Sequence, residues 1–195
     1  DFIPDICNAA QTHQGLWENT LNILKLLSEE IFDFSKDQIN SKQANELKDN
    51  MTVEFSKIYD LCVFVLNTYI ENPNSVKRAL VKSWLKTFAS FLSWIPFGYI
   101  FETDIIEKLL EHFFMAPTFR NDTLPCLVEI SSLKIEEDDP KFNDYTEKQF
   151  ILFVSFINNV VNVTLGKDLS SEHKLVTENQ RPHFEVFCLQ MGLML

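Results

Sequence analysis

The stretch Trp17–Phe34 reads WENTLNILKLLSEEIFDF and decides the fold class of this chain. Large apolar residues recur in it every three or four positions, which is the spacing of one face of an α-helix. The members of this face are Trp17, Leu21, Leu24, Leu27, Ile31 and Phe34. The stretch therefore predicts an amphipathic helix whose long apolar face needs partner helices to cover it.

The same period recurs along the rest of the chain, and no strand-like alternation bounded by turn residues competes with it. The sequence therefore predicts an all-α protein. We expect helices over residues 2–11, 16–34, 45–71, 75–93, 103–115, 120–132, 144–166 and 180–195.

Short connectors predict that these helices pair as antiparallel hairpins. The connector Asn72–Ser75 is the clearest case, whereas 35–44 and 134–143 are longer polar bridges. The approximate repeats are 2–34, 45–93, 103–132 and 144–195. This organisation fits a solenoid of about four hairpins, and it also fits a globular bundle of seven or eight helices.

Composition narrows the class of partner. The 195 residues include 17 Lys and Arg against 28 Asp and Glu, for a net charge of −11. This charge disfavours nucleic acid and anionic membranes as direct partners. The chain begins without Met and ends in an apolar run, so we expect it to be part of a longer protein.

The sequence contains no motif of an enzyme or a metal site. Its four glycines are too few for a phosphate loop, and its cysteines lack the spacing of metal ligands. We therefore expect no catalytic residue, no metal and no cofactor. Cys7, Cys62, Cys126 and Cys188 are interpreted as buried free thiols. A nucleophile pair of Cys126 and His112 leaves a small helical hydrolase as an alternative, although no third group would orient the histidine.

Two charged clusters are candidate contact surfaces. Glu29, Glu30 and Asp33 form either a solvated helix face or a contact for a basic partner. A basic stripe forms either a charge-balancing surface or a contact for an acidic partner. Its members are Lys77, Arg78, Lys82 and Lys86.

Four aromatic residues surround one proline and one glycine at a helix break. They are Trp94, Phe97, Tyr99 and Phe101. We interpret the cluster as a packed corner that fixes the angle between neighbouring hairpins. The structural corner residues are Trp94, Pro96, Gly98 and Tyr99.

Two stretches go beyond a generic helix pattern, Leu24–Ser35 and Trp94–Thr103. Together with Phe119–Asn121 and Cys126–Ile130, in the same order and spacing, they resemble the N-terminal third of the exportins. These proteins are the nuclear export receptors of the karyopherin-β family. The resemblance covers residues 2–133 and is weaker from 143 onward.

The resemblance implies a HEAT-repeat α-solenoid, a right-handed superhelix with an outer A helix and an inner B helix in each repeat. It implies a non-enzymatic receptor that shuttles between nucleus and cytoplasm. The implied partners are GTP-bound Ran, cargo with leucine-rich export signals, and Phe-Gly nucleoporins. Helices 16–34, 75–93, 120–132 and 180–195 would be inner helices, and Glu29, Glu30 and Asp33 would be candidate contacts to Ran.

The resemblance also implies limits. The cargo groove and its reactive cysteine lie further along such receptors, so this chain would supply part of the arch only. Lys82 and Lys86 depart from the family pattern, which weakens a role of the basic stripe in binding Ran. Pro125 also departs, and we expect it to move the helix start to Asp122 or Thr123. An α-solenoid scaffold or adaptor of another karyopherin-like protein is the alternative.

Overall fold

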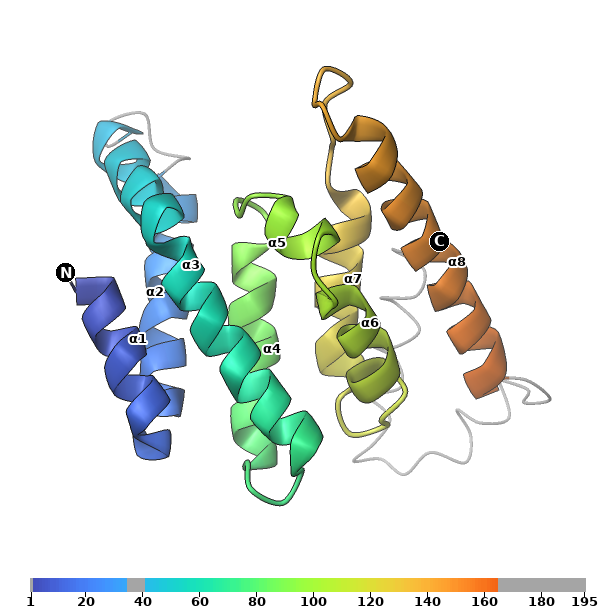
Figure 1. Cartoon of the computed structure of the whole chain (residues 1–195), viewed down its shortest axis with the longest axis horizontal. Coiled ribbons are helices and arrows are strands. Elements are labelled where there is room, and N and C mark those ends of the chain that lie inside the picture. Colours follow the sequence, from blue (N-terminus) through green and yellow to red (C-terminus); the bar gives the residue numbers. More distant parts are fainter. Residues whose placement is uncertain (1, 35–40, 165–195) are drawn as a thin grey trace. The chain divides into compact units, whose positions relative to one another are not determined.

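A computed structural model describes residues 2–34 and 41–164 of the chain (Figure 1). Within these ranges the side chains of 30–34, 41–48, 50, 51 and 160–164 are not described. The described residues form helices and turns without a strand, which confirms the all-α prediction. The predicted helix 180–195 lies outside the described residues. No described helix is long and apolar enough to cross a bilayer.

The chain forms two compact units, Asp1–Pro96 and Phe97–Leu195. The described elements of the first unit are four α-helices and one short 3₁₀ turn. In chain order they are α1 (Phe2–Thr12), η1 (Gln14–Leu16), α2 (Trp17–Phe34), α3 (Ser41–Glu71) and α4 (Arg78–Phe91).

The four helices of the first unit are stacked in two layers. Figure 1 shows α1 beside α3 in front, with α2 and α4 behind them. Side-chain hydrogen bonds join the rear layer: the Thr87 hydroxyl lies 3.3 Å from the Leu21 carbonyl oxygen, and the Ser83 hydroxyl 3.2 Å from Asn22 Oδ1. Thus one hairpin stacks on the next, as the predicted solenoid requires.

The core between these layers is rich in aromatic side chains. Trp84 stacks on Phe88 with ring centroids 5.1 Å apart, and both are buried. The indole of Trp84 donates a hydrogen bond to the Cys62 carbonyl at 2.9 Å, and that of Trp17 to the Ala10 carbonyl at 2.8 Å. Both indoles therefore bury their rings while satisfying their N–H groups, which avoids a desolvation cost.

The second unit is built around a cluster of phenylalanines. Its elements are α5 (Gly98–Phe101), α6 (Ile105–Lys108), the π-helical η2 (Leu109–Phe114), α7 (Arg120–Ser132) and α8 (Phe142–Thr164). The Phe114 and Phe156 rings join η2 to α8, with centroids 5.3 Å apart. The predicted single helix 103–115 is thus composed of α6 and η2, and α5 precedes it as a separate turn.

Helix α3 begins earlier than predicted. It starts at Ser41, so the predicted polar bridge of 35–44 is wrong in its last four residues. The residues from Lys42 to Lys48 include Gln, Ala, Glu and Leu, all of which favour a helix without forming an apolar face. Apolar spacing could not reveal this polar first part of the helix.

The prediction that Pro125 delays the start of its helix is wrong. Helix α7 begins at Arg120 and contains Pro125. The Arg120 backbone N–H bonds to the Ala116 carbonyl at 3.0 Å. The Phe119 carbonyl accepts bonds from both the backbone N–H and the hydroxyl of Thr123, at 2.9 and 2.8 Å. These bonds form the first turn before the chain reaches the proline.

Candidate partner-binding surfaces

Helix α2 places one of the three predicted acidic residues on the surface. Glu29 is exposed, and its carboxylate lies 3.0 Å from the ammonium group of Lys25, one turn earlier. Glu30 and Asp33 belong to the same helix, but their side chains lie outside the described residues. The interpretation of the three residues as one contact site stays a prediction.

Glu29 belongs to a polar surface that α2 and α4 form together, here called the α2–α4 surface. Asn22, Lys25 and Glu29 recur on one face of α2. Asn22 on this face accepts the hydrogen bond from Ser83 of α4. A surface of hydrogen-bonded and ion-paired side chains on two rigid helices suits a polar protein partner.

The predicted corner residue Trp94 completes the core of the first unit. Its ring packs edge-on against Phe55 and Phe91, with centroids 5.4 and 5.7 Å apart. Its indole donates to the Ser28 hydroxyl at 2.8 Å, and Ser28 donates in turn to the Ser90 carbonyl at 2.7 Å. Trp94 therefore joins α2, α3 and the end of α4.

The other three predicted corner residues lie just after Trp94 in the sequence. Pro96 is exposed and is the last residue of the first unit. Gly98 and Tyr99 begin α5 in the second unit, and Tyr99 is half-buried. A Cβ atom on Gly98 would lie 3.3 Å from Glu102 Oε1, so glycine leaves room for that carboxylate. That these residues fix the angle between repeats stays a prediction.

The second unit contains a polar cluster that sequence analysis missed. Glu102 Oε1 accepts hydrogen bonds from the Tyr145 hydroxyl and, at 2.6 Å, from the Lys141 ammonium group. These bonds lower the pKa of Glu102, with Lys141 the larger cause. Burial and the bond to Glu102 raise the pKa of Tyr145 to about 12. Lys148 donates to the Phe101 carbonyl. The cluster ties the start of α8 to α5.

The start of α8 is also fixed to the end of α7. The Gln149 amide nitrogen lies 3.0–3.1 Å from the carbonyl oxygens of Ile130, Ser131 and Leu133. The last carbonyls of a helix lack the N–H of a following turn, so a donor from a neighbouring helix can bond to them. The Ile130 carbonyl also accepts the backbone N–H of the C-cap residue Leu133, at 3.4 Å. Neither cluster has a short-range sequence signal, because its members lie 16 to 47 positions apart.

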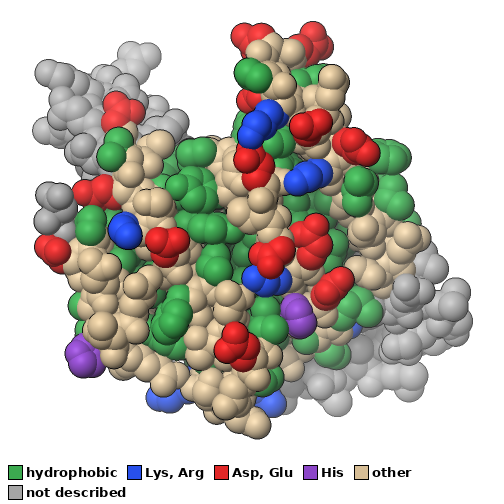
Figure 2. Space-filling view, viewed as in Figure 1, with side chains coloured by type: hydrophobic (Ala, Val, Ile, Leu, Met, Phe, Trp, Pro, Cys, Tyr) green, Lys and Arg blue, Asp and Glu red, His purple; other side chains and the backbone are tan. Residues whose placement is uncertain are grey.

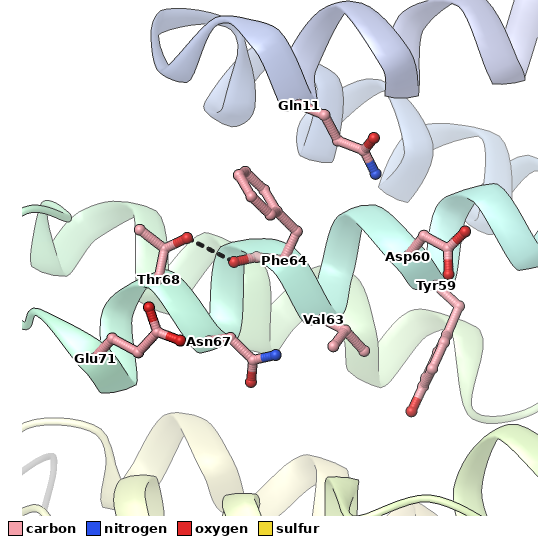
Figure 3. Close-up of a pocket in the computed structure, with 8 residues that line it drawn as sticks. All are labelled: Gln11, Tyr59, Asp60, Val63, Phe64, Asn67, Thr68 and Glu71. Carbon is pink, nitrogen blue, oxygen red and sulfur yellow. Dashed lines mark hydrogen bonds between the residues drawn. The ribbon is translucent and has the colours of Figure 1, made fainter.

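A groove of about 450 Å³ runs along α3 and reaches α1 (Figure 3). Its lining residues are Gln11, Tyr59, Asp60, Val63, Phe64, Asn67, Thr68 and Glu71. Figure 3 shows the Phe64 ring directed toward α1. The ring also packs edge-on against Trp17, the first residue of α2, with centroids 5.7 Å apart. Mixed aromatic, amide and carboxylate groups line the groove, and they favour no single class of ligand.

The described cysteines are buried and form no disulfide, which confirms the prediction for Cys7, Cys62 and Cys126; Cys188 lies outside the described residues. Burial raises the pKa of Cys7 to about 11 and that of Cys62 further. Cys126 is fully buried and His112 is exposed, so the thiol of this predicted nucleophile pair is not accessible to a substrate.

The described His, Cys, Asp and Glu residues form no group that could hold a metal ion.

Acidic side chains outnumber basic ones on the face of the molecule displayed in Figure 2. This distribution agrees with the net charge of −11. The basic stripe of α4 is therefore unusual in this chain. Lys77, Arg78 and Lys86 are exposed, and Lys82 is half-buried.

Known proteins resemble this chain over most of its length. The family model for the Exportin 1-like protein matches residues 1–127. Exportin-1 of Drosophila melanogaster is 49% identical over 141 residues, which are 72% of this chain and 13% of that protein.

Two further relatives match longer stretches. Protein EXPORTIN 1B of Arabidopsis thaliana is 40% identical over 169 residues, and Exportin-1 of Schizosaccharomyces pombe is 40% identical over 161. These matches cover 87% and 83% of this chain and 14% of each relative. The chain therefore spans about a seventh of the length of these relatives. Because the family model covers well over half of its residues, the chain belongs to the exportin 1-like protein family.

Proposed function

We propose that this chain is part of a nuclear export receptor and supplies a segment of its HEAT-repeat arch, not its cargo groove. The observation that carries the proposal is the family match over residues 1–127. The receptor would carry cargo with leucine-rich export signals together with GTP-bound Ran. It would contact Phe-Gly nucleoporins and shuttle between nucleus and cytoplasm.

The stacking of the first unit supports an architectural role. Helix α1 packs on α3 and α2 on α4, so each hairpin buries its apolar face against the next. In such stacks a small rotation at each interface adds up along the chain. Binding at one part of the arch would therefore change its curvature and influence binding elsewhere. This role needs no catalytic residue, and we propose that the segment is not an enzyme.

The acidic residues Glu29, Glu30 and Asp33 are proposed to contact basic side chains of GTP-bound Ran. Support comes from Glu29, which is exposed on the α2–α4 surface. An exposed ion pair contributes about 0–1 kcal/mol. Three such pairs do not offset the several kcal/mol of association entropy. We therefore expect the isolated chain to bind GTP-bound Ran weakly or undetectably.

The Ran contact is tested in an intact receptor. This chain would replace the matching segment of Drosophila Exportin-1, and stopped-flow fluorescence would follow the association of GTP-bound Ran. Reversing all three charges (Glu29→Lys, Glu30→Lys, Asp33→Lys) should slow association and change its salt dependence more than it changes dissociation.

A matched control reverses three exposed acids of the second unit, Glu107, Glu111 and Glu136. The control changes the net charge equally, so it should alter the association rate much less. If the α2 reversal leaves both rates unchanged, or if the control slows association as much, the three acidic residues do not contact Ran.

The placement of the cargo groove outside this chain is tested with the chain alone. Fluorescence anisotropy should detect no specific binding of a leucine-rich export-signal peptide. Binding with a micromolar Kd, about −8 kcal/mol, would show that the groove lies within this segment.

A further inference from the structure

Residues 72–101 have a charge composition unlike the rest of the chain. The segment contains Lys77, Arg78, Lys82 and Lys86 and none of the 28 acidic residues. Helix α4 accordingly has three cations and no acid. The concentration of one charge sign on one helix of an acidic chain requires a physical reason.

The geometry of α4 makes these cations a straight row. Arg78, Lys82 and Lys86 are spaced four residues apart, so they follow one face of the helix at steps of about 6 Å. The opposite face is anchored in the core by Trp84, Thr87 and Phe91, among others. The row of Arg78, Lys82 and Lys86, here called the basic row, is therefore held on a rigid support, and Lys77 directly precedes it at the N-cap of α4.

The basic row does not stabilise the helix that carries it. Like charges four residues apart repel each other, and Lys77 and Arg78 lie at the N-terminus, where the helix dipole disfavours cations. Among the described residues, the side chains of Lys77, Arg78 and Lys86 form no ion pair that would compensate this repulsion. An arrangement that is locally unfavourable is typical of a binding surface.

We propose that the basic row binds an acidic, extended peptide segment of a partner protein. In an extended peptide, alternate side chains point to the same side and lie about 6.6 Å apart. Acids at every second position would therefore meet cations at every fourth position of α4. The net charge of −11 repels the continuous phosphate backbone of a nucleic acid, which favours a short peptide. This inference does not depend on the proposed export function.

Peptide binding to the full chain tests the register. A labelled nine-residue peptide with Glu at every second position should bind in fluorescence anisotropy, and its affinity should fall as salt rises. A peptide of the same composition with its acids in one block should bind several-fold more weakly. Equal binding of the two peptides, or binding of neither, would overturn the proposed match between the spacing of acids in the peptide and the spacing of cations in the basic row.

Charge-reversal variants test the site. Arg78→Glu with Lys86→Glu should weaken binding of the alternating peptide about tenfold, because two attractions become repulsions. The control Lys57→Glu with Lys134→Glu alters two exposed cations outside the row and should have less than about a twofold effect. If both double variants bind the peptide equally well, the row is not the site.

Two further measurements complete the test. Arg78→Glu places an acid in the first turn of α4, where the dipole favours it, so the melting temperature of this single variant should not fall. If the variant keeps its fold and loses binding, the changed surface charge is the cause of the loss. A fall in melting temperature would overturn the argument that Arg78 is unfavourable for the helix.

A competition experiment separates a peptide site from a nucleic-acid site. A single-stranded oligonucleotide of equal charge should not displace the peptide, and displacement of the peptide would indicate a nucleic-acid site instead.

Discussion

Ser28 shows how one buried hydroxyl holds three segments of the first unit together. It accepts a hydrogen bond from Trp94 and donates one to the Ser90 carbonyl, and it is 1% exposed. Ser28→Ala would leave the Trp94 indole and the Ser90 carbonyl, both in half-buried residues, without this partner. We expect it to lower the free energy of unfolding by about 1–3 kcal/mol in urea titrations.

Ser83→Ala is the matched control for Ser28→Ala. It also removes a serine hydroxyl that bridges α2 and α4, but the bond to Asn22 is exposed and 3.2 Å long. Water can replace this bond, so the expected loss is below about 0.5 kcal/mol. Similar losses for both variants would mean that Ser28 does not form a buried bridge.

Tyr145 gives the second unit a measurable alkaline titration. Its pKa is raised to about 12 from an ordinary value of 10.0. The folded state thus holds this proton more tightly than the unfolded state, and the stabilisation is fully present below about pH 10. It is lost as the pH rises from about 10 to about 12.

Tyrosinate absorbance should therefore show a step near pH 12 that disappears in Tyr145→Phe. Stability measured against pH should also fall less steeply above pH 10 in this variant. A variant that retains the step would show that another tyrosine gives rise to it.

At the scale of elements, the Gln149 side chain of α8 forms hydrogen bonds with the end of α7. Gln149→Ala would remove the side-chain donor to the carbonyls of Ile130, Ser131 and Leu133. We expect a loss of about 1–2 kcal/mol in the stability of the second unit, with faster hydrogen exchange in the last turn of α7.

Gln149→Glu should be more destabilising than Gln149→Ala. It also removes the donor, and it places a negative charge at the negative end of the α7 dipole. The opposite order of stability would show that Gln149 acts through packing and not as a hydrogen-bond donor.

The sequence predicts these elements better than it predicts their contacts. Trp17, Leu21 and Leu24 recur at helical spacing and are buried as expected. Helical spacing reports only apolar faces, so it missed the polar start of α3 at Ser41. A local rule about proline likewise misplaced the start of α7, because hydrogen bonds formed before Pro125 establish the helix.

The candidate surfaces were predictable only in part. The charges of α4 and Glu29 can be found in the sequence because they are neighbours on one helix. The cluster of Glu102, Lys141 and Tyr145 joins residues up to 43 positions apart. No local pattern specifies such a pairing, because the tertiary packing of α5 against α8 brings these side chains together.

At the scale of the whole molecule, we propose that the stacked hairpins of this chain act within a longer receptor. The chain spans only 13–14% of its relatives, so its function is expected in the assembled protein. Apolar interfaces between successive hairpins stabilise such an arch, and the charges on its surface determine the specificity of partner binding. Substitutions in the core should therefore reduce stability, whereas substitutions on the α2–α4 surface should change partner binding.

The most direct test is export by a receptor that contains this chain. In cells depleted of their own receptor, Drosophila Exportin-1 with this chain in place of its matching segment would be expressed beside a fluorescent reporter bearing a leucine-rich export signal. The account predicts that the reporter leaves the nucleus, and that it stays there when its signal leucines are replaced. A folded, nuclear chimaera that leaves the intact reporter in the nucleus would contradict the claim that this chain is a working segment of an export receptor.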